Sequence, residues 1–337
     1  MTLESGSRSA NRTLFLTDRD VKSVFDWAAA VEALRAAYSA PQSAANFPPR
    51  TMARGKGRWL RTLSGVTPDG WLMGAKQIAA NLEAGRVSYL ISLFDQESVS
   101  LLALLDGNSI TGFRTAATSA LAADALAPKR SLLVGVIGSG FEAKKHVSAL
   151  AAIRTIAEVR VYSPSPASRG RFVEDLHGLG LPMHQVDAAE AAVRDADLVL
   201  CAARSRDESP TLRGEWLQPG QTILSIGSTL PEQHEVDAET ISRADRIVAD
   251  MVEEVAHETG DMIAAAAAGV PFTDKLLSLS ALMSGAVVGR PSPEAIVLYK
   301  SVGAALQDLA VAGQCYRGAV ALGLGTPLPV SVEPVEK

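Results

Sequence analysis

The sequence contains only two cysteines, Cys201 and Cys315, among 337 residues. Two cysteines are too few for a disulfide framework, and their separation lacks the clustered spacing of a zinc site. No apolar run approaches the roughly 18 residues that span a bilayer, and the opening stretch MTLESGSRSANR lacks the apolar segment of a signal peptide. We therefore expect a protein of the reducing cytoplasm without a membrane partner, and we expect residues 1–12 to form a loose terminus.

The sequence also has no large excess of positive or negative charge. The formal net charge is −5, and the charges are spread along the chain without a basic stripe that would suit a phosphodiester backbone. Nucleic acid is therefore not an expected partner. The histidines occur singly, so their spacing predicts no metal site; they are His146, His177, His184, His234 and His257.

The rest of the composition is that of an ordinary globular protein. Apolar residues make up 47% of the chain and charged residues 20%, as in folded rather than disordered proteins. Because 337 residues exceed the usual size of one domain, we expect two packed domains. We find no internal repeat, charge block or low-complexity linker.

The first 115 residues have the pattern of an α+β unit. Apolar residues at helical spacing predict one amphipathic helix over 18–39. Short alternating stretches broken by proline and glycine predict antiparallel strands and turns over 47–80, and YLISLFD and SLLALLD continue the β pattern. The segment SITGFRTAATSALAADALA then predicts a long helix that leads into the second region.

From Leu132 onward, apolar runs alternate with helical stretches. The runs LLVGVI, VRVYS, LVLCAA, TILSIG and RIVAD have no polar face, which is typical of buried parallel strands joined by crossover helices. We therefore predict an open α/β sheet. After Met251 the chain reads as largely helical, and we expect its Ala-rich segment 293–322 to pack on the first domain or on a second subunit.

The sharpest motif is GVIGSGFEA, directly after the strand LLVGVI. Gly138, Gly140 and Ala143 complete the GxGxxA form of the dinucleotide-binding fingerprint. The first glycine permits a tight turn, the second lets the backbone approach a pyrophosphate, and the alanine allows close packing of helix against strand, so that the helix N-terminus faces the phosphates. A glycine-rich turn without a ligand is the alternative reading.

The segment VYSPSPASRGR follows at the distance where NAD-binding sheets place an acidic residue for the ribose hydroxyls, and it contains no acid. Ser163 and Ser165 can instead hydrogen-bond a 2′-phosphate, with Arg169 or Arg171 supplying charge. We therefore favour NADP(H) as the cofactor and keep NAD(H) open. The alternative is that the arginines are solvated and the serines only form the turn around Pro164.

Three cationic residues of the first region are candidate site residues. Lys76 lies among apolar residues of a predicted strand, where a charge needs a buried or cleft-facing partner, and a lysine can donate a proton to an imine or carbonyl. Arg50 and Arg114 carry guanidinium groups, which suit a carboxylate. From the residues alone, a structural salt bridge or a surface charge is the favoured interpretation of each.

Several ordered blocks together resemble the ornithine cyclodeaminase and mu-crystallin family. They cover nearly the whole chain and read LLALLDGNSITGFRTAATSALAADALA, GVIGSGFEAKKH, DADLVLCAA, GQTILSIGSTLPEQHEVD, HETGDMIAA and YKSVGAALQDLAVA. The resemblance implies a fold of class α/β, in which a Rossmann-type doubly wound dinucleotide-binding domain accompanies an α+β substrate and dimerisation domain. We expect residues 1–120 with 310–337 to form the latter and residues 121–309 the former.

The resemblance also implies roles for individual residues of a homodimer whose active site lies between the two domains. Arg50 and Arg114 would hold the substrate carboxylate, and Lys76 would act near the reacting carbon. Cofactor contacts are implied for the fingerprint turn and for positions near the nicotinamide; they comprise Thr115, Thr118, Gly138, Ser139, Gly140, Phe141, Glu142, Ala143, Ser163, Ser165, Arg169, Ser228 and Ser301.

One departure from the family pattern bears on the reaction. Ornithine cyclodeaminases have an aspartate where this chain has Thr229, and a threonine cannot replace a carboxylate that orients an amine and shuttles protons. Ketimine reductases of the mu-crystallin type carry a small hydroxyl residue there. We therefore expect an NAD(P)H-dependent oxidoreductase that reduces an imine next to a carboxylate in a small amino or imino acid, or runs the reverse dehydrogenation. A cyclodeaminase-type lyase and an NADPH-dependent binding protein of mu-crystallin type remain alternatives.

We expect several other residues to have structural roles. Glu232, Glu235 and Asp237 are expected to be first-turn charges of a helix, Asp261 to begin the next helix, and Cys201 to lie in the core. Trp59 and Arg61 fall at substrate-lining positions of the family without matching its pattern of small residues and methionine, which leaves the substrate open.

Overall fold

A computed structural model of the chain describes residues 12–205 and 207–336. The loose terminus expected over 1–12 therefore lies outside the described residues except for Arg12. The chain divides into two compact units. The first unit comprises 12–25, 42–111 and 308–336, and the second comprises 26–41 and 112–307 without residue 206.

These limits differ from the expected domain boundaries, 1–120 with 310–337 and 121–309. Residues 26–41 and 112–120 group with the second unit, and residues 308–309 group with the first. The physical reason is packing: the helix α2 (Trp27–Ser39) packs against α4 (Phe141–Ile153) and α10 (Leu279–Met283) of the second unit.

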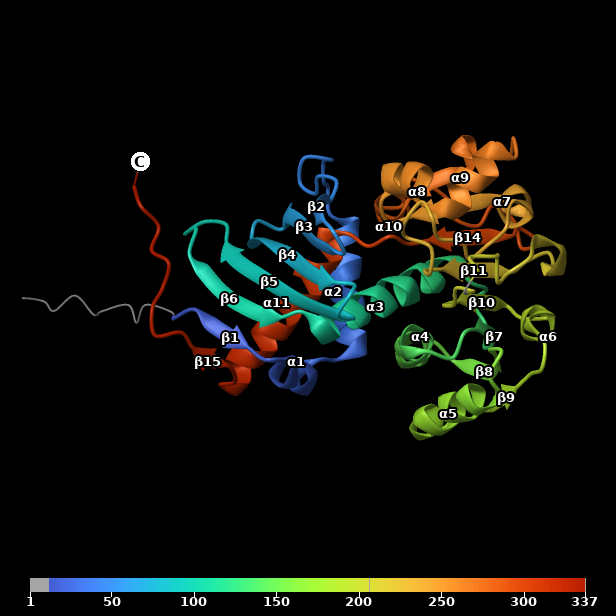
Figure 1. Cartoon of the computed structure of the whole chain (residues 1–337), viewed down its shortest axis with the longest axis horizontal. Helices are drawn as coiled ribbons and strands as arrows, with labels where there is room; N and C mark the ends of the chain where they lie inside the picture. The colour runs from blue at the N-terminus through green and yellow to red at the C-terminus, as the bar shows by residue number, and fades with distance from the viewer. Residues whose placement is uncertain (1–11, 206, 337) are drawn as a thin grey trace, which may run out of the picture. The chain divides into compact units, whose positions relative to one another are not determined.

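A seven-stranded sheet organises the first unit, in the order β15-β1-β6-β5-β4-β3-β2 (Figure 1). The neighbours are antiparallel except for the parallel pair β1 and β6, so the predicted antiparallel strands are confirmed. The strands are β1 (Leu14–Leu16), β2 (Thr51–Gly55), β3 (Arg58–Val66), β4 (Leu72–Asn81), β5 (Arg86–Asp95), β6 (Leu101–Asp106) and β15 (Thr326–Pro327).

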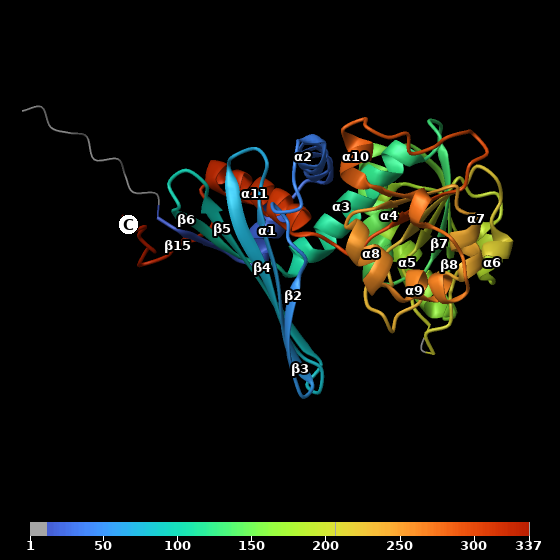
Figure 2. The same cartoon turned by 90° about the horizontal axis from the view of Figure 1, so that it is seen from above.

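The helix α11 (Ala305–Leu322) covers one face of this sheet from Asp308 onward, as Figures 1 and 2 show. Two glycines allow the close approach. A Cβ added at Gly313 would lie 2.7 Å from a methyl carbon of Leu72, and one added at Gly74 would lie 3.0 Å from a methyl carbon of Leu309. Leu72 and Leu309 are buried, so the core of the first unit lies between the sheet and α11.

The predicted single helix over 18–39 is wrong, because the structure has two helices there. The helix α1 (Asp18–Val24) begins with a capping box in which Thr17 and Asp20 satisfy each other's backbone N–H groups. Phe25 is extended, and the Asp26 carboxylate then accepts a hydrogen bond from the Ala29 N–H, which starts α2. The apolar period continues across this break, so periodicity did not reveal that Asp26 is an N-cap.

An eight-stranded parallel sheet forms the second unit, in the order β13-β12-β14-β11-β10-β7-β8-β9, most of which Figure 1 labels. Its strands are β7 (Leu132–Ile137), β8 (Ile156–Tyr162), β9 (Met183–Gln185), β10 (Leu198–Cys201), β11 (Thr222–Ser225), β12 (Arg246–Ala249), β13 (Leu276–Ser278) and β14 (Val297–Lys300). The order reverses between β7 and β10. In doubly wound folds, this reversal opens a crevice at the carboxyl ends of the strands, where dinucleotides bind. The predicted Rossmann-type sheet is confirmed.

Helices flank the parallel strands. Besides α2, α4 and α10 they are α3 (Asn108–Leu126), which begins in the first unit, α5 (Pro166–Leu176), α6 (Ala189–Val193), α7 (Ala238–Arg243), α8 (Val252–Glu258), α9 (Gly260–Ala267) and the 3-10 turns η1 (His177–Leu179), η2 (Gly214–Trp216) and η3 (Thr273–Lys275). The expectation of a largely helical chain after Met251 misses β13 and β14. Val297–Lys300 is buried throughout, and a segment of four residues is too short for periodicity to separate strand from helix.

Both cysteines are buried free thiols, and Cys201 ends β10 in the core as predicted. Within residues 12–205 and 207–336, no helix combines the length and apolar character that crossing a membrane requires. The cytoplasmic location stays a prediction.

Candidate active site

The turn between β7 and α4 has a geometry that only glycine satisfies. Gly138 has φ +111°, and a Cβ added there would lie 2.5 Å from the carbonyl oxygen of Ala202. Its N–H donates to the carbonyl of Tyr162 at 2.8 Å, which ties the turn to the end of β8. The first glycine of the fingerprint therefore serves the tight turn.

The N-terminus of α4 is open to a ligand. Gly140 is the N-cap and supplies no side-chain hydrogen bond, so the first N–H groups of the helix have no capping partner from that residue. A Cβ added at Gly140 would meet no atom within 4 Å, so there is space directly above the turn. Ala143 is fully buried against the sheet side. A helix N-terminus with this space above it suits an anionic group such as a phosphate.

The first turn of α4 also carries Phe141 and Glu142. Phe141 is exposed, and its ring approaches α3 so closely that a Cβ added at Gly112 would lie 2.5 Å from a ring carbon. Burial raises the pKa of Glu142, although the charges of Arg114 and Lys145 oppose the shift. The next turn holds His146, whose pKa burial lowers to about 4, so that this side chain is neutral at pH 7 and bridges α4 to Ser119 of α3.

The predicted phosphate-recognition segment is more ordered than a solvated turn. The Ser139 hydroxyl donates to Ser163 Oγ at 2.9 Å, which joins the fingerprint turn to the end of β8. Ser165 caps α5 by accepting from the Ser168 N–H. Arg169 is buried, donates to the Ser163 carbonyl at 2.7 Å and pairs with Asp187 at 2.7 Å. Ser165 is therefore the N-cap of α5, a role not predicted from the sequence, and the alternative that Arg169 is solvated is wrong.

A second cluster forms where β12 and β14 end. Asp250, which follows β12, accepts hydrogen bonds from the Ser301 hydroxyl at 2.7 Å and from the N–H groups of Val302 at 3.0 Å and Gly303 at 2.8 Å. All four residues are buried or within a buried turn. Ser301, the residue expected near the nicotinamide, is therefore positioned by Asp250 at the carboxyl edge of the parallel sheet.

Arg114 lies on α3 beside this turn. Its Nη1 donates to Gln307 Oε1 at 2.6 Å, and its side chain is largely buried. Gly303 has φ +88°, and a Cβ added there would lie 2.4 Å from Arg114 Nη1, so a side chain at position 303 would displace the guanidinium. On the same helix, Thr118 donates to the Arg114 carbonyl at 2.7 Å, while Thr115 is half-buried.

The segment after β11 holds the residue that departs from the family pattern. Thr229 is half-buried, and both its N–H and its hydroxyl donate to Gln233 Oε1, at 2.9 and 3.3 Å. The neighbouring Ser228 is fully buried and donates to the Gln233 carbonyl at 2.6 Å. This stretch therefore presents hydroxyl groups that are held by Gln233.

The expectation that Glu235 is a first-turn charge of a helix is wrong, because Glu235 is a buried carboxylate. Its Oε2 accepts from the Ser225 hydroxyl at 2.6 Å and from the Gly227 N–H at 2.9 Å, and its Oε1 accepts from the Ala203 N–H at 3.1 Å. Burial raises its pKa to about 7, against the opposing charge of Lys300. Asp237, in contrast, does lie at the start of a helix: it is the N-cap of α7, and its carboxylate accepts a hydrogen bond from the Thr240 N–H.

A buried ion pair adjoins Glu235. Lys300 Nζ lies 2.6 Å from Asp261 Oδ2 and donates to Ser225 Oγ at 2.9 Å, and both charged side chains are fully buried. Asp261 does stand in the first turn of α9, as expected, and its Oδ1 also accepts from the Glu235 N–H at 2.7 Å. These contacts hold together the ends of β11 and β14 and the starts of α7 and α9.

In the first unit, Lys76 is on β4 as predicted and forms a buried salt bridge. Its Nζ lies 2.6 Å from Asp308 Oδ1 of α11, and the side chains are 1% and 0% exposed. Lys76 pairs in register with Leu63, and Arg61 pairs with Ile78, so Lys76 and Arg61 share one face of the sheet. Arg61 also stacks over the Trp59 ring at 5.2 Å.

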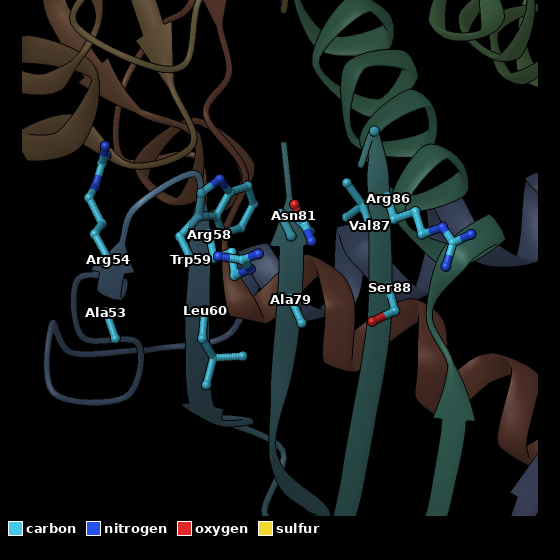
Figure 3. A pocket seen from close by; sticks show the side chains of 13 residues that line it. Ala53, Arg54, Arg58, Trp59, Leu60, Ala79, Asn81, Arg86, Val87 and Ser88 are labelled. Atoms are coloured by element: carbon cyan, nitrogen blue, oxygen red, sulfur yellow. The ribbon is translucent and has the colours of Figure 1, made fainter. Parts of the chain in front are cut away.

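Arg50 is half-buried and directly precedes β2. Farther along the same sheet, the ends of β2 to β5 border a hollow of about 930 Å³. Figure 3 shows that arginine side chains and Trp59 surround it, together with smaller residues of β3 to β5. The arginines that line it are Arg54, Arg58 and Arg86.

The structure thus brings together some predicted residues and adds others. Within the second unit it unites Arg114 with the Ser301 turn, and Ser139 with Ser163. Sequence reasoning did not single out Asp250, Gln307, Asp308, Lys300, Ser225 or Tyr38. Two signals were present: Asp250 stands at the carboxyl end of a predicted parallel strand, where functional residues gather, and Asp308 belongs to the YKSVGAALQDLAVA block.

The sequence model of the ornithine cyclodeaminase/mu-crystallin family matches residues 12–322. This chain belongs to that family.

Three relatives illustrate the similarity. A Delta(1)-pyrroline-2-carboxylate reductase of Bacillus cereus is 31% identical over 262 residues, which are 77% of each chain. The structure of Thermococcus litoralis Delta(1)-pyrroline-2-carboxylate reductase with NADH and L-proline has a TM-score of 0.85 at 27% identity and covers 94% of this chain and 100% of that one. An archaeal alanine dehydrogenase dimer with bound NAD has a TM-score of 0.85 at 27% identity and covers 96% and 99%.

Proposed function

We propose that this family member is an NAD(P)H-dependent oxidoreductase that reduces an imine next to a carboxylate, or oxidises the corresponding amino acid. The observation that carries the proposal is the buried pair of Lys76 and Asp308 at 2.6 Å. Burying two charges costs free energy, and such pairs are weak devices for stability alone. A chemical role for the ammonium group explains why the pair is kept. The reductase and dehydrogenase relatives support the same reaction class.

Each residue receives a role in that reaction. The guanidinium groups of Arg50 and Arg114 bind the substrate carboxylate. Lys76 donates a proton to the imine nitrogen, and Asp308 stabilises the ammonium form before the transfer. When bound, the nicotinamide cofactor supplies the hydride that reduces the C=N carbon, so hydride and proton together convert C=N to CH–NH. The N-terminus of α4 would hold its pyrophosphate, Ser228 and Ser301 would contact the cofactor near the nicotinamide, and Thr229 would contact the substrate.

The cofactor proposal is NADPH in preference to NADH. The loop after β8 has no acid that would bind ribose hydroxyls and repel a 2′-phosphate. Ser163 and Arg169 are held in contact there. The Asp187 partner of Arg169 is 98% exposed, so a phosphate can replace it at the guanidinium without burying the displaced carboxylate.

We also propose a homodimer formed through the sheet of the first unit. On the face opposite Lys76, Leu60 pairs with Ala79 and Leu90 pairs with Gln77. Leu60 is 44% exposed and Leu90 is 38% exposed, and exposed apolar rows on a long sheet are typical of protein interfaces. The archaeal alanine dehydrogenase dimer supports the dimeric state.

One assay tests the proposed reaction. Purified protein is mixed with NADPH or NADH and a panel of cyclic imino acids or of oxo acids with ammonia, and the near-ultraviolet absorbance of the reduced cofactor is followed. Substrate-dependent loss of absorbance supports the reductase. Ornithine is tested separately for proline and ammonia, because their release without net absorbance change would indicate the lyase reaction and overturn the argument from Thr229. No turnover with any substrate, together with tight NADPH binding, would favour a binding protein.

A further inference from the structure

A buried polar chain connects the end of β12 to Arg114. Asp250 Oδ2 accepts a hydrogen bond from Gln307 Nε2 at 2.9 Å, in addition to those from Ser301 and Gly303. Gln307 Oε1 in turn accepts from Arg114 Nη1 at 2.6 Å. Gln307 is fully buried and Asp250 nearly so, and every link of this chain lies in the second unit.

The chain determines which way the Gln307 amide faces. An ionised carboxylate only accepts hydrogen bonds, so Asp250 requires the NH₂ end of the amide on its side. The same Nε2 also donates to the Tyr38 hydroxyl at 2.9 Å. Both contacts leave Oε1 as the group that meets Arg114. The reverse orientation would oppose two acceptors at Asp250 and two donors at Arg114, each at a cost of a buried unsatisfied group.

The amide also adds no opposing charge beside Arg114. A glutamine accepts from the guanidinium without neutralising it, whereas a carboxylate at the same place would compete with any anionic ligand. Gly303 contributes by sterics, because its turn lies against Arg114 Nη1 and is itself held by Asp250. One carboxylate therefore positions both the Ser301 turn and the amide that orients the guanidinium.

We propose that Asp250 and Gln307 are positioning residues that aim Arg114 at the substrate carboxylate, with a neutral amide as the acceptor for Arg114 Nη1. This inference rests on the proposed function, in which Arg114 binds that carboxylate. It makes Gln307 a determinant of affinity for carboxylate substrates rather than for the cofactor.

The decisive variant is Gln307→Glu, measured in the full-length protein. We expect KM for the imino acid to rise about tenfold or more, as when a charge-assisted hydrogen bond to a ligand is lost, while the NADPH dissociation constant stays within about twofold. One oxygen of the introduced carboxyl takes the place of Nε2 and meets Asp250 Oδ2, so the two carboxylates oppose each other until one of them binds a proton. The defect should therefore shrink as the pH is lowered, because protonation restores a neutral partner for Arg114. The charged or titratable groups around this site that the pH series must consider are Asp250 after β12, Tyr38 of α2, Tyr299 of β14, Arg114 of α3, and Glu142 and His146 of α4.

A matched control separates this effect from general damage. Gln221 is also a buried glutamine of the second unit, and its Nε2 donates to the carbonyls of Val193 and Ala196, away from Arg114. Gln221→Glu makes the same chemical change and should leave KM for the imino acid and its pH dependence unaltered. If Gln307→Glu does not fold, Gln307→Met removes the acceptor without adding charge, and we expect a several-fold rise in KM that does not depend on pH.

Arg114→Lys distinguishes failure of the inference from failure of the proposed function. A raised KM in Arg114→Lys, with both Gln307 variants unchanged from the native protein, would overturn only the positioning role. An unchanged KM in Arg114→Lys would instead remove Arg114 from carboxylate binding. A pH-relieved KM defect confined to Gln307→Glu supports the inference.

Discussion

Glu235→Gln provides a direct test of the buried carboxylate at the carboxyl edge of the parallel sheet. In the native protein, Glu235 is fully buried, and its pKa is raised from about 4.5 to about 7 by that burial, while Lys300 opposes the shift. Glutamine keeps the shape and one acceptor but cannot ionise. The variant therefore removes the proton equilibrium of this site while disturbing little of the packing.

The sign and size of the effect follow from linkage. A carboxyl whose pKa is higher in the folded protein binds more protons there than in the unfolded chain, so its contribution to stability is complete below about pH 4.5 and is lost as the pH rises through about 7. At about 1.4 kcal/mol per pH unit, the loss between these values is about 3 kcal/mol. Glutamine also places an NH₂ group against a backbone N–H, either that of Ala203 or that of Gly227, which costs about 1–3 kcal/mol.

The native protein should therefore be more stable than Glu235→Gln near pH 5, and the difference in the free energy of unfolding should shrink by about 2.5 kcal/mol and approach zero or reverse near pH 8. Urea unfolding of both proteins, followed by circular dichroism at several pH values, measures this difference. Glu232→Gln is the control, because Glu232 is exposed three positions earlier and the same change there should leave the pH dependence of unfolding intact. Parallel curves for the native protein and Glu235→Gln would refute the reasoning.

Further predictions concern the proposed roles. Lys76→Met should abolish turnover and destabilise the protein by about 3–5 kcal/mol, because the Asp308 carboxylate stays buried without its ammonium partner. Adding Asp308→Asn should restore stability but not turnover, while NADPH binding stays detectable by fluorescence titration. Activity in the double variant would exclude the proton-donor role. Arg169→Ala should weaken NADPH by about tenfold and NADH much less, and equal losses would remove the argument for 2′-phosphate recognition. Leu60→Arg should convert a dimer to a monomer in size-exclusion chromatography with light scattering, and an unchanged mass would place the interface elsewhere.

Much of the fold could be predicted because its signals are local. Alternating apolar residues predicted the antiparallel strands, and continuous apolar runs such as LLVGVI predicted the parallel ones. Gly138 and Gly140 predicted the dinucleotide-binding turn, because a backbone torsion and the space for a ligand near the backbone depend on a few consecutive residues. Prediction was weakest where local patterns carry little information. The apolar period of a helix continues across Asp26 although the helix breaks there, and Val297–Lys300 is too short to show a period of its own.

The sequence by itself determined the family, the order of most elements, the fingerprint turn and the types of residue on which the chemistry depends. Only the tertiary structure decided their partners. Lys76 meets Asp308 across 232 positions of the chain, and Arg114 meets Gln307 across 193. The physical reason is that a buried charge takes its stability, orientation and pKa from whichever groups the fold places within hydrogen-bonding distance, and no periodicity or spacing records such long-range pairs.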